Sequence, residues 1–193
     1  MKLKKLALLL LLISQVTVGQ DLNSLKIEAQ KVYEATAILD FDKIIDGTYP
    51  KVFEIVSKEQ MKQILISTFN GNDEMKIKLL NVPPDFKFGE IKKIDTQTFC
   101  LIDHNLSMEL TLQEKIEDDE EAEMMLEIFK AGMETDKVTF NKETNTFTIT
   151  KISTMIGIAD QATNNTWKFL NKDKENVLAT KLFSKKVLKE LGM

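Results

Sequence analysis

Few residues in this chain of 193 could do acid–base or nucleophilic chemistry, because it has one histidine and one cysteine. His104 stands between Asp103 and Asn105, a polar trio that predicts a hairpin corner. There a histidine is more often an exposed turn residue than a catalytic one. Cys100 lies in the apolar run 98–102, where an unpaired cysteine is usually a small buried hydrophobe rather than a nucleophile. A mechanism that needs two histidines is excluded.

The sequence gives little support for catalysis by a carboxylate or for a metal site. No Asp or Glu stands isolated inside an apolar strand, the setting that raises a carboxyl pKa and makes a general base. One His and one Cys cannot supply the ligands of a zinc site. Residues 171–182 lack the glycine and the final glutamate of an EF-hand loop. The acidic run 117–123 is interpreted as a solvated helix start. We predict no cofactor and no metal site, and no catalytic residue is assigned.

Three aromatic residues with polar tips, Tyr33, Tyr49 and Trp167, are candidates for lining a small-molecule pocket. Their rings combine a large apolar area with a hydrogen-bonding group, which suits ligand sites. The alternative is core packing, which the helix and strand periodicity of most aromatic residues favours. Met124 and Met125 pose the same choice between an adaptable contact surface and a core, and the core interpretation is again favoured.

The elements that must position these residues begin with helices. Apolar residues recur at three- and four-residue spacings over 22–40, which predicts an amphipathic helix. Asp40 is expected to cap a short second helix that ends near Gly47. A short strand is expected at 52–56. Ser57 and Gln60 then form a capping box for a third helix that runs to about residue 69, with inward positions at Met61, Ile64, Leu65 and either Thr68 or Phe69.

Beyond the turn at 70–73 the hydrophobic period changes to two, which predicts antiparallel strands. Those strands are expected at 75–79, 86–88, 91–94, 98–103, 106–112, 138–140, 146–151, 155–159 and 166–170. An acidic first turn, which the helix dipole favours, begins an inserted helix at 118–134. Two short helices, 177–183 and 185–191, form a C-terminal tail, with Ser184 as the cap of the second. The predicted fold class is α+β, with a strongly curved antiparallel sheet packed on the N-terminal helices.

The first nineteen residues have the pattern of a secretory signal peptide. Three lysines precede the apolar run Leu6–Ile13, and small residues stand at Thr17 and Gly19. The run is shorter than the roughly 20 apolar residues that span a bilayer, so a retained anchor helix is the less favoured alternative. No cysteine follows for lipid attachment. We therefore expect a signal peptide at 1–19 and a single domain at 20–193.

The charge pattern limits the partners. Without residues 1–19 the chain keeps 23 of its 26 basic residues against 30 acidic ones, a formal charge of −7. Every basic residue is lysine, so no guanidinium group is available for bidentate contacts to phosphates or bases. Nucleic acid is not expected as a partner. The absence of Arg beside abundant Lys, Asn and Ile resembles the codon usage of an AT-rich bacterial genome. We expect an exported bacterial protein, periplasmic or extracellular, without a disulfide inside the chain.

The order of helix, short helix, short strand, helix and curved antiparallel strands resembles the NTF2-like (SnoaL-like, cystatin-like cone) superfamily over about residues 22–171. The matching pieces are Tyr33 and Ala35, the connector Asp40–Pro50, the helix start Ser57–Gln60 and the strand Trp167–Leu170. The inserted helix 118–134 and the tail after residue 176 depart from the minimal cone. The resemblance implies a cone-shaped sheet. Because the superfamily includes enzymes, binding modules and assembly domains, the fold alone implies no reaction.

The leading functional hypothesis is a non-catalytic exported protein that binds a small apolar molecule or an envelope protein partner, with a homodimer as a further option. Its only membrane contact would be through the signal peptide during export. The alternative is an NTF2-like isomerase or dehydratase in which a pocket carboxylate acts as general base. An Asp or Glu in an apolar cavity within hydrogen-bond reach of Tyr33 or Tyr49 would favour the enzyme. A filled cone with an exposed apolar patch on helix 118–134 would favour a protein partner.

Overall fold

Two long antiparallel strands run along the centre of the molecule in the computed structural model, which describes residues 22–72 and 74–193. They are β4 (Gln97–Leu112) and β6 (Thr146–Ala159), paired without a bulge from Thr98 opposite Ala159 to Thr111 opposite Thr146. The signal peptide predicted at 1–19 lies outside the described residues. Within them the fold is α+β, with six α-helices and an open seven-stranded antiparallel sheet. No described helix has the length and apolar character needed to cross a membrane.

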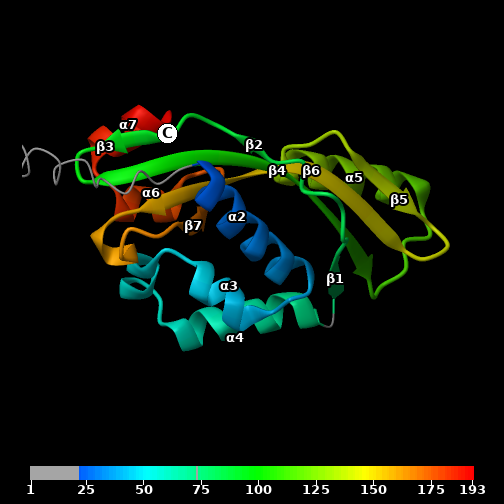
Figure 1. Ribbon diagram of the computed structural model, residues 1–193. Coiled ribbons are helices and arrows are strands. Elements are labelled where there is room, and N and C mark those ends of the chain that lie inside the picture. The colour runs from blue at the N-terminus through cyan, green and yellow to red at the C-terminus, as the bar shows by residue number, and fades with distance from the viewer. Residues whose placement is uncertain (1–21, 73) are drawn as a thin grey trace, which may run out of the picture.

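Short strands flank the long pair at both ends (Figure 1). We call the end that contains residues 97–103 of β4 the proximal half and the end that contains residues 108–112 the distal half. The proximal flanking strands are β2 (Lys87–Phe88) and β3 (Lys92–Ile94) beside β4, and β7 (Lys168–Asn171) beside β6. The distal flanking strands are β1 (Met75–Leu79) beside β4 and β5 (Val138–Asn141) beside β6.

The hairpin corner predicted at residues 103–105 is wrong, because these residues lie in the middle of β4. Their polar groups form hydrogen bonds with β6 and with the segment before β2. Asp103 accepts a hydrogen bond from the Thr154 hydroxyl at 2.6 Å, and the Asn105 amide N–H donates to the Pro84 carbonyl at 2.7 Å. The two strands predicted on either side of the corner are therefore one strand. In the same way, those predicted at 146–151 and 155–159 are both parts of β6.

Local hydrogen bonds fix the N-terminal helices, α2 (Leu22–Ala37), α3 (Phe41–Gly47) and α4 (Lys58–Asn70). The predicted caps are confirmed, since Asp40 accepts from the Lys43 amide at 3.2 Å and Ser57 forms a capping box with Gln60. The strand predicted at 52–56 is wrong. A 3₁₀ helix, η1 (Pro50–Glu54), takes its place and begins with a proline, whose fixed φ suits a first helical turn.

In the proximal half both faces of the sheet are covered. Leu25 and Ala29 of α2 pack on a face that includes Cys100 and Ile102. The opposite face, which includes Phe99, packs on the C-terminal helices α6 (Val177–Leu182) and α7 (Lys185–Leu191). Both tail helices and the Ser184 cap of α7 are confirmed.

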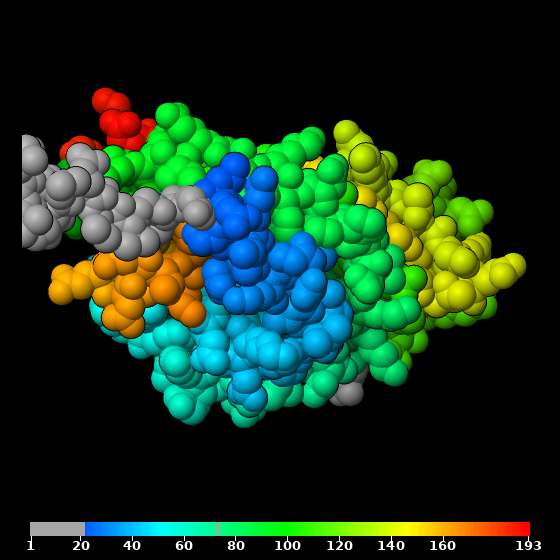
Figure 2. Space-filling view, viewed as in Figure 1, coloured from blue at the N-terminus to red at the C-terminus, as the bar shows by residue number. Residues whose placement is uncertain are grey.

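In the distal half a helix packs on one face of the sheet. The inserted helix, confirmed as α5 (Asp119–Met133), packs over Leu110 and Phe147. The opposite face carries a row of hydroxyls, including the hydrogen-bonded pair Thr111 and Thr146 at 2.9 Å. In Figure 2 the atoms of α2 and α3 cover the middle of the molecule, and the distal half extends beyond them.

Candidate functional site

An apolar cavity of about 240 Å³, which we call the inner cavity, lies along the free edge of β7. Phe169 and Leu170 are consecutive, so their side chains point to opposite faces of the strand, yet both line the cavity. Beyond β7 the sheet continues only through an isolated bridge to Thr48, where the Tyr49 amide donates to the Phe169 carbonyl at 2.9 Å. The other lining residues are Val32, Thr36, Ile44, Gly47, Val52, Met61, Leu65, Asn171 and Leu178.

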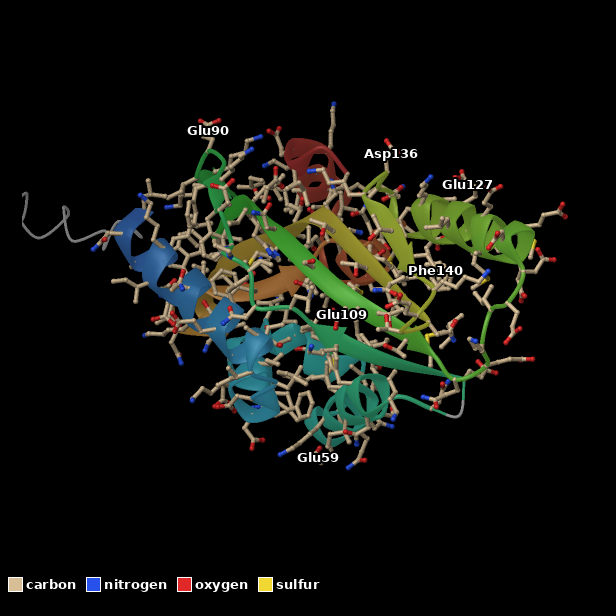
Figure 3. All side chains as sticks on the ribbon, turned by 90° about the vertical axis from the view of Figure 1, so that its right-hand side faces the viewer. Glu59, Glu90, Glu109, Glu127, Asp136 and Phe140 are labelled. Atoms are coloured by element: carbon tan, nitrogen blue, oxygen red, sulfur yellow. The ribbon has the colours of Figure 1, made fainter. Side chains whose placement is uncertain are left out.

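Helix α4 covers this cavity without burying any of its own residues fully. Met61 and Leu65 face the cavity and are half-buried. Ile64, predicted to point inward, is 53% exposed, so that prediction is wrong. Figure 3 shows Glu59 of the same helix projecting away from the molecule. A helix with so little buried surface is held weakly compared with the core.

The hydroxyl groups in the wall of the inner cavity are already engaged. Thr36 donates to the Val32 carbonyl at 2.9 Å, and Thr48 donates to the Ile44 carbonyl at 2.8 Å. Both bonds stay within the residue's own helical segment, and among residues 22–72 and 74–193 no charged side chain lines the cavity. The cavity therefore presents mainly methyl, methylene and phenyl groups. Such a surface favours apolar occupants over polar ones, because a polar group would lose its bonds to water there.

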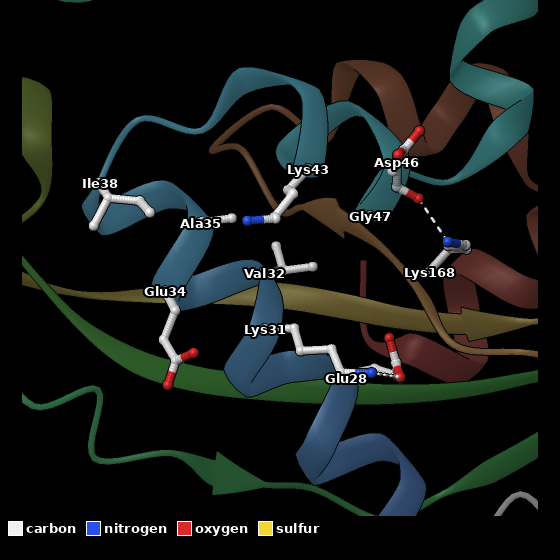
Figure 4. A pocket seen from close by; sticks show the side chains of 10 residues that line it. All are labelled: Glu28, Lys31, Val32, Glu34, Ala35, Ile38, Lys43, Asp46, Gly47 and Lys168. Carbon is white, nitrogen blue, oxygen red and sulfur yellow. Dashed lines mark hydrogen bonds and ion pairs between the residues drawn. The ribbon is translucent and has the colours of Figure 1, made fainter.

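A second hollow, which we call the outer groove, has a volume of about 370 Å³ and lies on the outer side of α2 and α3. Six of its ten lining residues have charged side chains (Figure 4). Glu28 pairs with Lys31 at 2.7 Å, and Lys168 Nζ donates to the main-chain oxygen of Asp46 at 2.6 Å. The remaining lining residues are Val32, Glu34, Ala35, Ile38, Lys43 and Gly47.

Val32 and Gly47 line both the inner cavity and the outer groove, so their contact forms a shared wall. A Cβ atom added at Gly47 would stand 2.4 Å from Cγ2 of Val32, well inside van der Waals contact. Glycine at position 47 therefore lets α3 approach α2 closely enough to close the space between the two hollows. In Figure 4, Val32 lies between Lys43 and Lys31.

The candidate Tyr49 is buried away from the inner cavity, beside a buried carboxylate. Its hydroxyl donates to Asp160 Oδ2 at 2.7 Å, and Gln97 Nε2 donates to the same oxygen at 2.8 Å. The other carboxylate oxygen accepts from the Thr163 amide at 3.1 Å. A shallow polar hollow with Lys51 on its rim lies next to this group.

These contacts determine the charge of the pair. Burial disfavours the charge on Asp160, but hydrogen bonds from Tyr49, Gln97 and the amides of Thr163 and Ala162 outweigh it and lower the pKa of the carboxyl. The pKa of Tyr49 is raised by burial and by the adjacent carboxylate. Asp160 is thus a stable anion at neutral pH. It meets the distance criterion for a base beside Tyr49 but lacks the raised pKa that such a base needs.

The candidate Tyr33 connects α2 to the segment before β2. Its hydroxyl donates to the Val82 carbonyl at 2.8 Å, and its ring meets the His104 ring edge-on with centroids 5.5 Å apart. Tyr33 also borders a shallow hollow beside Pro83 and Pro84. His104 is 9% exposed, so the prediction of an exposed turn histidine is wrong. Burial lowers the pKa of His104.

The candidate Trp167 is part of the core beneath α2. It is 2% exposed, and its Nε1 donates to the Ser24 hydroxyl at 3.2 Å. Tyr33, Tyr49 and Trp167 thus lie at three separate places and do not surround one cavity. Cys100, predicted to be a buried thiol, is 1% exposed, and burial raises its pKa to about 11, which confirms that prediction.

The residues that build the two hollows were not among the candidate site residues. Val32, Met61 and Leu65 were expected only as inward positions of amphipathic helices, and Gly47 only as a helix end. No sequence signal marked them. Ile64, which the sequence placed inward, is exposed in the structure, so the incomplete packing of α4 became visible only there.

Metal binding and similarity to known proteins add no further assignment. Within residues 22–72 and 74–193 no three His, Cys, Asp or Glu side chains are placed to hold a metal ion. No protein-family model and no curated protein matches the chain.

Proposed function

We propose that this protein is a non-catalytic binding module that holds a small apolar ligand in the inner cavity. The observation that supports this most directly is the cavity itself, an apolar space of about 240 Å³ beneath a helix that has no fully buried residue. Well-packed domains contain few voids larger than a water molecule. A ligand would add contacts to Met61 and Leu65, which line the cavity.

Helix α4 is the proposed entry route. It contacts both α3 and β1, and on α3 Phe69 stacks on Phe41 with centroids 6.3 Å apart and Lys62 pairs with Asp42 at 2.6 Å. An exposed ion pair of this kind contributes at most about 1 kcal/mol. Displacement of α4 therefore costs less than opening either face of the proximal sheet, where the side chains are fully buried.

Export and family membership are part of the same proposal. The sequence pattern of residues 1–19 supports secretion from a bacterial cell, and the order of elements in residues 22–171 supports a distant relation to the NTF2-like superfamily with a cone-like sheet. An intact mass that begins at Gln20 in protein recovered from outside the cytoplasm would support export. A mass that includes Met1 and Lys2 would contradict it.

The enzymatic alternative has less support. A general base that works near neutral pH needs a pKa near 7, and the pKa of Asp160, the buried carboxylate beside Tyr49, is lowered. Its two oxygens are also occupied by donors from Tyr49, Gln97 and Thr163. A substrate would have to displace one of these donors before it could reach the carboxylate.

A protein partner is the second candidate function, because α5 has an exposed apolar strip. Met124 and Ile128, one helical turn apart, are 57% and 52% exposed, and Figure 3 shows Glu127 projecting from the same helix. The core interpretation favoured for Met124 is therefore wrong, and the exposed strip on helix 118–134 supports an envelope protein partner. The variant Ile128→Lys should abolish such a complex, measured by native mass spectrometry, and leave ligand binding unchanged.

The proposed function is tested by native mass spectrometry of the protein from its own source, followed by titration with the uncharged fluorescent probe N-phenyl-1-naphthylamine. We expect saturable binding that Leu65→Trp abolishes, because an indole would fill the inner cavity. Ile64→Trp, one position along α4 and facing solvent, is the matched control and should bind as the wild type does. Equal binding by both variants would refute the proposal.

A further inference from the structure

The wall between the inner cavity and the outer groove is one side chain thick. Val32 contributes to both hollows, and Gly47 lies against it from α3. Moving or shortening the Val32 side chain would therefore join an apolar chamber to a charged one. The joined space falls within the roughly 300–1,000 Å³ typical of small-molecule sites, whereas the inner cavity alone is smaller than this range.

The charges in the outer groove are not equivalent. Lys31 pairs with Glu28 and Lys43 pairs with Asp40, each at 2.7 Å. Lys168 forms no ion pair with a carboxylate in the described part of the chain, and its bond to Asp46 is to the main-chain oxygen. An ammonium group has three N–H donors, so Lys168 can offer two more to a ligand.

Lys168 is also well placed relative to the inner cavity. It precedes Phe169, which lines that cavity, and it faces the outer groove itself. A ligand that contacts both residues would extend along the edge of β7 past Val32. The contact between Val32 and Gly47 closes the direct path, so the ligand has to displace the Val32 side chain, which favours an unbranched chain.

We infer that the two hollows form one site for a linear amphiphile, with its hydrocarbon chain in the inner cavity and an anionic head group on Lys168 in the outer groove. This inference rests on the proposed function and adds the chemical class of the ligand. A charge-assisted hydrogen bond to Lys168 supplies the preference for an anion. The apolar wall supplies the affinity for the chain.

The test compares four probes that share an unbranched ten-carbon chain by calorimetry at neutral pH: 1-decanol, decanoate, decyl phosphate and decyltrimethylammonium. We expect decanoate or decyl phosphate to bind about tenfold more tightly than 1-decanol, the lower end of what one bond to a charged group contributes, and the cation to bind more weakly. Whichever of the two anions binds more tightly shows whether the site prefers a carboxylate or a phosphate head group. Equal affinities for the alcohol and both anions would overturn the inference.

Failure of the inference is distinguishable from failure of the proposed function. If 1-decanol binds and the Leu65→Trp variant does not bind it, the inner cavity is a ligand site whatever the head-group preference. If neither 1-decanol nor N-phenyl-1-naphthylamine binds, the proposed function itself fails. In that case binding of decanoate alone would indicate a surface contact to lysine.

Two variants locate the head group. Lys168→Met should remove the preference for the anion and leave the affinity for 1-decanol unchanged. Lys115→Met, which changes the charge equally but removes a lysine that lies outside both hollows and pairs with Glu117, should keep the preference. The same loss of preference in both variants would show a general charge effect and refute the role of Lys168. High salt should also weaken the preference in the wild-type protein, which requires no substitution.

A third pair of variants tests the wall. Val32→Ala should tighten binding of decanoate, because chain and head group could then occupy both hollows without displacing a side chain. Ile27→Ala, on an exposed part of the same helix, is the matched control and should leave affinity unchanged. Weaker or unaltered binding in Val32→Ala, with the fold intact by circular dichroism, would show that the hollows are separate.

Discussion

Removing the hydroxyl group of Tyr49 tests whether Asp160 is held as a buried anion. In the Tyr49→Phe variant the ring keeps its place in the core, while Asp160 Oδ2 loses the donor at 2.7 Å and keeps only Gln97 at 2.8 Å. The substitution adds no volume and removes one oxygen. The hydroxyl also accepts from Gln97 Nε2 at 3.2 Å, but that nitrogen keeps its bond to Asp160 Oδ2, so the effect on stability comes mainly from the bond that Tyr49 donates to Asp160.

The expected cost is about 2 kcal/mol of unfolding free energy, because hydrogen bonds to charged groups contribute about 1.5–3 kcal/mol. Asp160 is 5% exposed, so the lost donor is poorly replaced by bulk water. The polar hollow beside Asp160 and Gln97 gives some access to water, which keeps the cost below the upper end of that range.

The pH dependence has a definite sign. The pKa of Asp160 is lowered in the folded state, so its contribution to stability is complete above the unfolded pKa of about 3.9 and is lost as the pH falls below it. In Tyr49→Phe the carboxyl pKa moves back toward its ordinary value. The difference in stability between the two proteins should thus be full at neutral pH and shrink below about pH 4.

Urea unfolding at neutral pH and at steps down to about pH 3.5 measures both effects. Tyr33→Phe is the matched control, since that hydroxyl donates to the neutral Val82 carbonyl at 2.8 Å. Its loss should cost about 1 kcal/mol without a change in this pH range. A cost below about 0.5 kcal/mol for Tyr49→Phe, or one that does not change with pH, would refute the assignment of a stabilised anion.

Three further predictions concern His104, Glu134 and Asn145. Burial lowers the pKa of His104, so its NMR titration, which is unambiguous in a chain with one histidine, should have a midpoint below about 6.5. The free energy of unfolding should fall as the pH drops below that value, and a His104→Gln variant should not show this fall. A midpoint at or above 6.5 would contradict the burial. Glu134 ends α5 with a φ of 54°, so Glu134→Gly should stabilise the protein by about 0.5–1 kcal/mol in urea unfolding, whereas Glu134→Ala should not. Asn145 donates to the carbonyls of Leu112 and Glu114 at 2.9 and 2.7 Å and accepts from an amide at 3.1 Å. Asn145→Ala should therefore cost about 3 kcal/mol, and a loss under 1 kcal/mol would mean that water replaces these bonds.

Features that depend on neighbouring residues were predictable from the sequence. The caps at Asp40, Ser57 and Ser184 form through hydrogen bonds to amides three positions away, so the spacing in the sequence already contains the interaction. The same is true of the acidic start of α5, where Asp118 accepts from the Glu120 amide at 2.9 Å.

Features that depend on distant partners were not predictable. Asp103, His104 and Asn105 indicate a turn when considered alone, but Thr154 and Pro84 supply their hydrogen-bond partners and allow the strand to continue. Those partners lie 51 and 21 positions away in the chain, so no local pattern contains them.

The inner cavity could not be predicted for a related reason. Its lining residues lie between Val32 and Leu178 in the chain. Taken singly, each of them stands where an ordinary core residue would be expected. A cavity is a space between elements, and its existence depends on how closely α4 approaches β7. The sequence placed even Ile64 of α4 inward, and only the structure shows it exposed.

The unbroken pairing of β4 and β6 sets an order for folding. Thr111 and Thr146 are 35 positions apart, whereas Thr98 and Ala159 at the other end of the pair are 61 apart. Loop closure is least costly at the distal end, and each later pair adds to a ladder already begun. The inner cavity needs residues near both ends of the described chain, from Val32 to Leu178, so it is completed last. A ligand bound there should then slow unfolding without accelerating refolding, because its contacts are absent when the transition state forms.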